Sequence, residues 1–268
     1  MPAPKNLFKQ ALKEGRAQIG LWQALANPYT VEISAGAGYD WLLLDAEHAP
    51  NDVPLLVSQL QAMKGAASHA VIRPPVGETW IIKQMLDIGA QTLLIPMVDS
   101  KEMAEAMVRA MRYPPQGVRG VGAALARASA FNRIPDYLQT ANDEICLLLQ
   151  VESRAGLAAL DAIASTDGVD GVFIGPADLA ADMGHLGKPG ARAVQAEVEK
   201  ALARIQSHGK AAGILIGDLS LAKRYLELGA TFVAIGNDVT LLTNATTRLL
   251  DDFKKAEPSR PATDAKVY

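Results

Sequence analysis

The sequence contains almost no cysteine. Its single cysteine, Cys146, lies within the apolar run ICLLLQV. One thiol cannot build a disulfide framework or a cysteine-based zinc site, so both are excluded. We expect Cys146 to be buried as a small apolar side chain.

The sequence also lacks an excess of positive charge and any long apolar segment. It has 26 lysines and arginines against 29 aspartates and glutamates, which gives a net charge of −3. We therefore expect no basic surface that would attract a nucleic-acid backbone. No apolar segment approaches the roughly 20 residues that cross a bilayer, and the first residues lack the apolar core of a signal peptide. These absences predict a cytoplasmic protein with no nucleic-acid and no membrane partner.

Short apolar runs that alternate with amphipathic segments make up most of the chain. The predicted strands are residues 19–22, 41–45, 70–73, 92–96, 145–151, 171–174, 212–216 and 232–235. They are apolar on both faces, which is typical of parallel strands buried on both sides. Eight such strands in 268 residues predict an α/β fold, a single (β/α)₈ TIM barrel over residues 1–254, followed by a polar tail over residues 255–268.

The segments between these strands have helical periodicity. The predicted helices include residues 51–63, 78–88, 101–111, 193–208 and 220–228, with a last helix near residues 239–254. Gly89 and Gly229 follow two of them, as is typical of helix C-caps. Residues 113–142 are rich in Gly, Ala and Arg and separate strands four and five. A loop of that length in a compact barrel is usually functional, so we expect a role for it.

The chemistry of such a barrel lies at the carboxyl ends of its strands. The residues at or just after these ends include Trp22, Asp45, Glu47, His48, Arg73, Gln150, Glu152, Asp178, Asp218 and Asp238. Several acids, one histidine and one arginine therefore converge on one face of the predicted barrel. No lysine ends a predicted strand, which disfavours a Schiff-base mechanism.

Glu152 and Asp178 are the candidate metal ligands. Both follow apolar strands, where a lone carboxylate is costly to bury without a cation or hydrogen-bond donors. Alternatively, Asp178 caps a helix and Glu152 accepts backbone N–H groups. Two carboxylates without cysteine or clustered histidine favour a hard, octahedral ion such as Mg²⁺ or Mn²⁺ over Zn²⁺.

His48 is the one histidine at the carboxyl end of a predicted strand among acids, which makes it the candidate general base. Alternatively, His48 is a structural histidine. His69, in contrast, leads into strand three at the opposite end of the barrel. Arg73 is either a structural partner of Asp45 or Glu47, or a fixed positive charge that faces a developing oxyanion.

Six segments, in order, resemble the HpcH/HpaI aldolase family. They are WLLLDAEHAP, IRP, QTLLIPMV, RYPPQGVRGVG, QVE and GVFIGPADLAADMG. The resemblance covers nearly the whole chain except its tail, and it departs at Ala46, where glycine is expected. It implies a barrel of the phosphoenolpyruvate/pyruvate type in a homohexamer, a trimer of dimers whose last helix is exchanged between subunits.

The resemblance also implies roles for individual residues. Glu152 and Asp178 would hold Mg²⁺, Mn²⁺ or Co²⁺, and no nucleotide or pyridoxal phosphate is implied. His48 would be the proton acceptor, made more basic by Asp87, which the sequence alone places at a helix end. Arg73 would stabilise the transition state. The residues expected to contact substrate are Gln150, Asp178 and the backbone of Ala177 for pyruvate, and Trp22, Asp45, Arg119 and Arg127 for the aldehyde.

The implied activity is metal-dependent retro-aldol cleavage of 4-hydroxy-2-oxoheptanedioate into pyruvate and succinate semialdehyde, within the breakdown of aromatic compounds. Three alternatives remain open. The substrate could be a sugar acid such as 2-dehydro-3-deoxyglucarate. The chain could instead resemble the citrate lyase β subunit and cleave an acyl-CoA thioester. It could also be a barrel that binds without catalysis.

Overall fold

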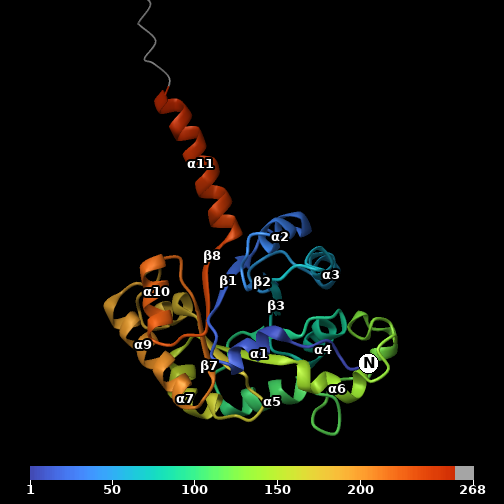
Figure 1. Ribbon diagram of the computed structural model, residues 1–268. Coiled ribbons are helices and arrows are strands. Elements are labelled where there is room, and N and C mark those ends of the chain that lie inside the picture. Colours follow the sequence, from blue (N-terminus) through green and yellow to red (C-terminus); the bar gives the residue numbers. More distant parts are fainter. Residues whose placement is uncertain (257–268) are drawn as a thin grey trace, which may run out of the picture.

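Eight parallel strands close into a barrel in sequential order. The computed structural model describes residues 1–256 of the chain (Figure 1). The strands are β1 (Gln18–Gln23), β2 (Trp41–Asp45), β3 (His69–Arg73), β4 (Thr92–Ile95), β5 (Cys146–Val151), β6 (Gly171–Ile174), β7 (Ala211–Leu215) and β8 (Phe232–Asn237). The predicted barrel is confirmed, and each strand lies within two residues of its predicted bounds.

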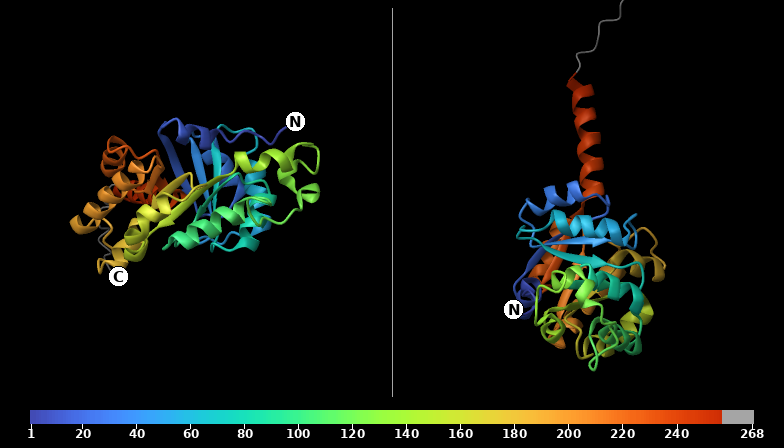
Figure 2. Two further views of the ribbon diagram at one scale, coloured as in Figure 1. Left: turned by 90° about the horizontal axis from the view of Figure 1, so that it is seen from below. Right: turned by 90° about the vertical axis from the view of Figure 1, so that its right-hand side faces the viewer.

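Most of the helices surround this barrel, as Figure 2 shows, whereas the last one projects away from it. They are α1 (Leu7–Lys13), α2 (Pro28–Ala35), α3 (Val53–Ala62), α4 (Thr79–Asp87), α5 (Lys101–Met111), α6 (Tyr137–Glu144), α7 (Arg154–Ala164), α8 (Pro176–Asp182), α9 (Arg192–Ser207), α10 (Leu219–Glu227) and α11 (Asp238–Ala256). Gly89 and Gly229 have φ angles of 102° and 91°, which confirms the predicted left-handed caps.

The predicted loop over residues 113–142 is partly helical. Two 3₁₀ turns, η1 (Ala123–Leu125) and η2 (Arg127–Ser129), lie within it, and α6 begins at Tyr137. The expectation of one continuous loop was therefore wrong at its end. Tyr137 and Ala141 are buried on one side of α6, which explains why this short segment folds as a helix.

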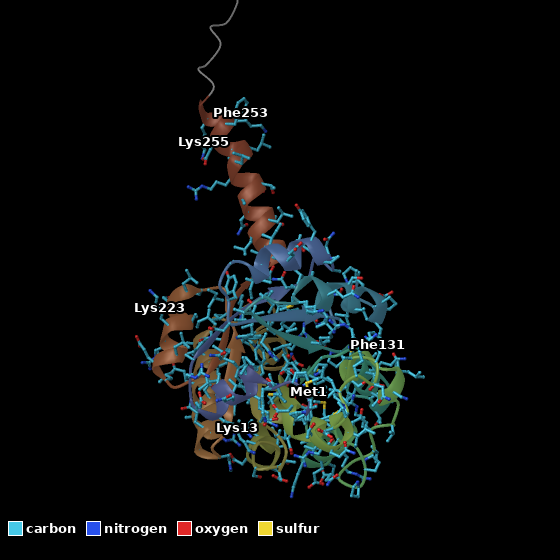
Figure 3. All side chains as sticks on the ribbon, turned by 45° about the vertical axis from the view of Figure 1, so that its right-hand side comes forward. Met1, Lys13, Phe131, Lys223, Phe253 and Lys255 are labelled. Carbon is cyan, nitrogen blue, oxygen red and sulfur yellow. The ribbon has the colours of Figure 1, made fainter. Side chains whose placement is uncertain are left out.

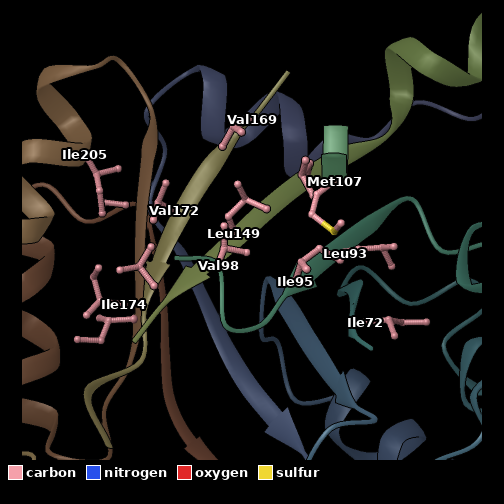
Figure 4. Packing of buried hydrophobic residues seen from close by; sticks show 14 of the residues in the cluster. Ile72, Leu93, Ile95, Val98, Met107, Leu149, Val169, Val172, Ile174 and Ile205 are labelled. Carbon is pink, nitrogen blue, oxygen red and sulfur yellow. The ribbon is translucent and has the colours of Figure 1, made fainter. Parts of the chain in front are cut away.

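Because side chains point alternately to the two faces of each strand, they pack into two separate apolar cores. Leu42 and Leu44 of β2 face outward and belong to the large core between strands and helices, part of which Figure 4 shows. Leu43, between them, belongs to a smaller core inside the barrel. Since side chains alternate with a period of two, Trp41 and Asp45 face inward with Leu43. The inward rows of β2 and β5 thus run from an apolar residue at the amino end to a polar one, Asp45 or Gln150, at the carboxyl end.

Aromatic side chains fill the amino end of the interior. Phe8 of α1 lies 5.9 Å from Trp41 and 6.3 Å from Phe232 between ring centroids, and it stacks on His69. The glycine at position 20 makes room for this packing, because a Cβ there would lie 2.2 Å from the Trp41 ring. This end of the barrel is therefore closed, and access to the interior is from the carboxyl end.

The last helix, α11, projects away from the barrel (Figures 1 and 2). Figure 3 places Phe253 and Lys255 near its far end, well away from the barrel. Leu249 and Phe253 are 74% and 66% exposed. No helix within residues 1–256 has the length and apolarity to cross a membrane. Most of the predicted polar tail, residues 257–268, lies outside the described residues.

Candidate active site

A cavity of about 320 Å³ opens at the carboxyl end of the barrel. Its walls are formed by Trp22, His48, Arg73, Gln150, Glu152, Phe173, Gly175, Pro176, Ala177, Asp178, Pro189, Leu215, Ile216 and Gly217. This set contains charged and polar side chains as well as apolar ones. The structure thus brings together most of the residues predicted from strand ends. Among the described residues that line the cavity there is no lysine.

Arg73 is held in place by two acids from the end of β2. Its Nε and Nη2 atoms donate to the two carboxylate oxygens of Asp45 at 2.9 and 2.7 Å. Its Nη1 atom lies 2.9 Å from Oε2 of Glu47. The ring of Trp22 packs against the guanidinium, 5.2 Å from its Cζ atom. The structural partners considered for Arg73 are therefore both present, and because it has five N–H groups, it retains donors for a ligand.

The two acids next to Arg73 differ in their protonation behaviour. Burial raises the pKa of Asp45, but the hydrogen bonds and charge of Arg73 outweigh it, so the pKa is lowered. Burial raises the pKa of Glu47, and the charges of Arg73 and His48 only partly oppose this. Asp45 is 1% exposed and does not line the cavity, so its observed contact is with Arg73 rather than with the space for substrate.

Glu152 is the most perturbed acid of the cavity. Burial raises its pKa to about 7, against the opposing donors Gln150 and Met97 and with the support of the charges of Asp178 and Glu47. Its Oε1 atom accepts the backbone N–H of Met97 at 3.0 Å, and its Oε2 atom accepts Nε2 of Gln150 at 2.5 Å. The backbone N–H contact considered for Glu152 exists, but it leaves the charge of the carboxylate uncompensated.

Glu152 and Asp178 fit a divalent cation. Both line the cavity, and Asp178 is an exposed residue in the first turn of α8, whose N-cap is Gly175. Asp178 is therefore not the N-cap considered as its alternative role. Mutual repulsion of two carboxylates is relieved by a hard cation with oxygen ligands. Gln150, which also lines the cavity, adds a buried Oε1 atom that has no hydrogen-bond partner among the described residues.

His48 lines the cavity from the turn after β2. Its side chain is 68% exposed, and its Nε2 atom lies 3.8 Å from Oε2 of Glu47. The imidazole is thus free to meet a ligand, and one carboxylate is close to it. His69 begins β3 at the other end of the barrel, as expected from the sequence, and is half-buried.

Asp87 and the arginines of residues 113–142 do not line this cavity. Asp87 ends α4, which runs from the carboxyl end of β3 towards the amino end of β4, and it accepts Nη2 of Arg119 at 2.8 Å. Arg119 is buried over the ring of Tyr113 at 4.3 Å. Arg127 donates to the backbone oxygen of Ile88 at 2.9 Å. Within one chain these three charged residues belong to a separate region.

Two features of the site were not predicted from the sequence. Met97 has a left-handed φ of 56°, which directs its N–H at Glu152, and no residue type near it signals this conformation. Gly175 must lack a side chain, because a Cβ there would lie 2.5 Å from Oε2 of Glu152. The glycine before the Pro-Ala-Asp sequence was the only signal of that close approach.

Similar proteins identify the family of this chain. Residues 18–245 match the family described as HpcH/HpaI aldolase/citrate lyase. The chain is 59% identical to the hydroxypyruvate/pyruvate aldolase of Pseudomonas aeruginosa, with 100% of both chains covered. It is 55% identical to the 4-hydroxy-2-oxo-heptane-1,7-dioate aldolase of Klebsiella pneumoniae, over 98% of this chain and 99% of that relative.

A solved structure extends this similarity to the fold. The HpcH/HpaI aldolase/citrate lyase family protein from Burkholderia cenocepacia superimposes with a TM-score of 0.90 at 41% identity, over 93% of this chain and 100% of the other. The resemblance noted in the sequence is therefore confirmed. The chain belongs to the HpcH/HpaI aldolase/citrate lyase family and is a lyase of the aldolase type.

Proposed function

We propose that this lyase is a divalent-metal-dependent aldolase that makes or breaks a carbon–carbon bond at the methyl carbon of pyruvate. The observation that supports it most is the presence of Glu152, Asp178 and Arg73 on one cavity. A Schiff-base aldolase needs a lysine at that place, and none of the described lining residues is one. The carboxylates and the guanidinium instead favour electrostatic stabilisation of an enolate.

The roles of the cation and its ligands follow from the cavity. Glu152 and Asp178 would hold Mg²⁺, Mn²⁺ or Co²⁺, which when bound supplies a Lewis acid for the ketone oxygen. Gln150 and the backbone of Ala177, which also line the cavity, would bind the 2-oxo acid. The N–H groups of Arg73 that Asp45 and Glu47 leave free face the developing enolate oxygen.

His48 supplies the base in the direction of cleavage. It accepts the proton of the 4-hydroxyl group, through a water molecule, as the bond between carbons three and four breaks. The electron pair of that bond passes into the pyruvate fragment, and the other fragment leaves as an aldehyde. The exposure of His48 towards the cavity allows this contact without movement of β2.

The substrate we propose is 4-hydroxy-2-oxoheptanedioate, cleaved into pyruvate and succinate semialdehyde. Trp22 and the apolar wall of Phe173, Leu215 and Ile216 would receive the aldehyde. In a second candidate reaction, hydroxypyruvate takes the place of pyruvate, because a relative at 59% identity is named hydroxypyruvate/pyruvate aldolase. Arg73 is the one permanently charged cation among the described lining residues. The carboxylate at the far end of the proposed substrate therefore has few positively charged partners within one chain.

Cleavage of synthetic 4-hydroxy-2-oxoheptanedioate, with pyruvate detected by lactate dehydrogenase, tests this function. Protein stripped with EDTA should be inactive and should regain activity with Mn²⁺, and borohydride with pyruvate should not inactivate it. Inactivation by borohydride would refute the metal mechanism. Rates of the reverse reaction with succinate semialdehyde and with glycolaldehyde, each with pyruvate or hydroxypyruvate, separate the two substrate candidates.

We also propose a homohexamer, a trimer of dimers, in which α11 packs on a neighbouring subunit. Leu242, Leu249 and Phe253 are seven and four residues apart and so share one face of α11, and all three are exposed. A second copy is also needed if Asp87 is to act on His48, because the two lie in separate regions of one chain.

Light scattering tests the assembly. The wild-type mass should correspond to six chains, and Leu249→Lys combined with Phe253→Lys should lower it, because charges would enter the apolar interface. Asn244→Lys, on the opposite face of α11, is the matched control and should leave the mass unchanged. A monomeric wild type would contradict both the hexamer and the proposed action of Asp87 on another subunit.

A further inference from the structure

The turn after β2 holds Glu47 and His48 in a defined geometry. Oδ1 of Asp45 accepts the backbone N–H of Glu47 at 3.0 Å. Nδ2 of Asn51 donates to the backbone oxygen of Asp45 at 2.6 Å, and the N–H of Ala46 donates to the backbone oxygen of Arg73 at 2.9 Å. The backbone that carries Glu47 and His48 is thus anchored to β3 and to the turn itself.

Glu47 is the one acid that contacts both Arg73 and His48. Its Oε2 atom lies 2.9 Å from Nη1 of Arg73 and 3.8 Å from Nε2 of His48, and its side chain is 15% exposed. The same oxygen is buried and has no partner with hydrogen-bond geometry. Its contact with Arg73 is therefore ionic and leaves its acceptor capacity open towards the imidazole. A buried carboxylate oxygen left in this state calls for an explanation.

His48 has few other restraints. Its side chain is 68% exposed, and among the described residues Glu47 is its only ion-pair partner. An exposed side chain without a partner changes rotamer in picoseconds to nanoseconds. Asp87, to which the family resemblance assigns the histidine, contacts Arg119 instead. Within a single subunit, the group that can restrain the imidazole is therefore Glu47.

We propose that Glu47 is a positioning residue that couples His48 to Arg73, so that one carboxylate sets the base and the enolate-stabilising cation relative to each other. This inference rests on the function proposed above. Glu47 does not line the cavity and need not touch the substrate. It acts through the two groups that do, in the way a carboxylate orients the imidazole of a catalytic dyad.

Glu47→Gln tests this coupling, because it removes the charge at nearly constant volume. We expect kcat to fall by roughly tenfold to a hundredfold, the effect of misplacing a catalytic group. The KM for the 2-oxo acid and the affinity for Mn²⁺ should change by less than about twofold, since Glu152 and Asp178 are untouched. Glu78→Gln is the matched control, because Glu78 is exposed and contacts Trp80, and it should behave as wild type.

A double-mutant cycle with His48→Ala separates positioning from a merely structural role. If Glu47 acts through His48, Glu47→Gln should lower kcat by less than about twofold in the His48→Ala background. An equal loss in both backgrounds would overturn the inference, as would unchanged turnover of Glu47→Gln. Wild-type protein without aldolase activity would refute the proposed function itself, which is a different result.

A second measurement does not depend on turnover. Relaxation of the ¹³Cε1 group of His48 by NMR reports motion of the imidazole directly. Fast motion of this group should increase in Glu47→Gln, whereas His208, which contacts Asp161, should be unchanged as an internal reference. Identical relaxation of His48 in wild type and Glu47→Gln would overturn the inference, whatever the activity of either protein.

Discussion

The two ends of the barrel interior differ in whether their ionisable groups are charged. At the amino end, Phe8 stacks on His69, and burial lowers the pKa of His69 to about 4, so that imidazole is neutral. At the carboxyl end, Arg73 and Asp45 form a buried ion pair, and burial raises the pKa of Glu152 to about 7. At the amino end the histidine is neutral and closely packed. At the carboxyl end the charges of the side chains are not fully balanced by neighbouring groups of the protein.

This difference separates stability from function within one continuous interior. Neutral, close-packed groups cost little to bury, and an unbalanced carboxylate is costly unless a ligand compensates it. Strained or unsatisfied groups concentrate at functional sites for this reason. Substitutions at the two ends should therefore affect different properties of the protein.

Arg73→Ala should have the largest effect, because it removes the cation at the charged end. Turnover should fall by about a hundredfold to a thousandfold, or about 3–4 kcal/mol of barrier, by analogy with a lost oxyanion donor. Mn²⁺ affinity, measured by electron paramagnetic resonance, should be retained. Because Asp45 would lose its buried partner, the free energy of unfolding should also fall by about 3–5 kcal/mol. Unchanged turnover would refute the role assigned to Arg73.

Phe8→Ala should produce the opposite pattern at the packed end. Phe8 is 1% exposed, so urea unfolding should show a loss of about 3–5 kcal/mol from the cavity created. The value of kcat/KM per folded molecule should be unchanged. Leu7→Ala is a matched control on the same helix, because Leu7 is 67% exposed. A large loss of kcat/KM in Phe8→Ala would show that the two ends are not separable.

Glu152→Gln should stabilise the metal-free protein at high pH. The pKa of Glu152 is raised from its ordinary 4.5 to about 7, so folding favours its protonated form. Its contribution to stability is full below pH 4.5 and is lost as the pH rises to about 7. This difference corresponds to about 3 kcal/mol, which the uncharged amide should restore above that pH. Unfolding curves at pH 8 should show the gain, and curves at pH 4 should not.

The smallest effect should be a pH dependence of metal affinity. Mn²⁺ requires the carboxylate form of Glu152, so its apparent affinity should weaken by up to about tenfold for each pH unit below about 7. Titrations followed by electron paramagnetic resonance between pH 5 and 8 measure this dependence. An affinity that does not change over this range would contradict Glu152 as a ligand.

The sequence predicted the barrel and most of the cavity, because both follow from local patterns. Arg73, Gln150 and Glu152 could be predicted as site residues from their places at strand ends, because the carboxyl ends of parallel strands lie at one face of the barrel. The sequence offered Asp45 both as a partner of Arg73 and as a substrate contact, and it could not decide between them, because the contact with Arg73 depends on the pairing of β2 with β3. Nor could it predict the left-handed backbone of Met97.

Residues 113–142 show a different limit of sequence analysis. Length and composition indicated a functional loop, but the burial of Arg119 depends on its place over the ring of Tyr113 and on a contact with Asp87, which is distant in sequence. The pattern of α11 indicated a helix and left open what covers its apolar face. Quaternary contacts are not encoded in local periodicity.

Proton exchange at the methyl group of pyruvate in D₂O, followed by NMR on EDTA-stripped protein, tests the central claim most directly. It reports enolate formation without requiring the correct aldehyde. We predict exchange that appears when Mn²⁺ is added and is absent without it. Exchange that proceeds equally without metal, or no exchange in the presence of Mn²⁺, would contradict a metal-dependent pyruvate aldolase.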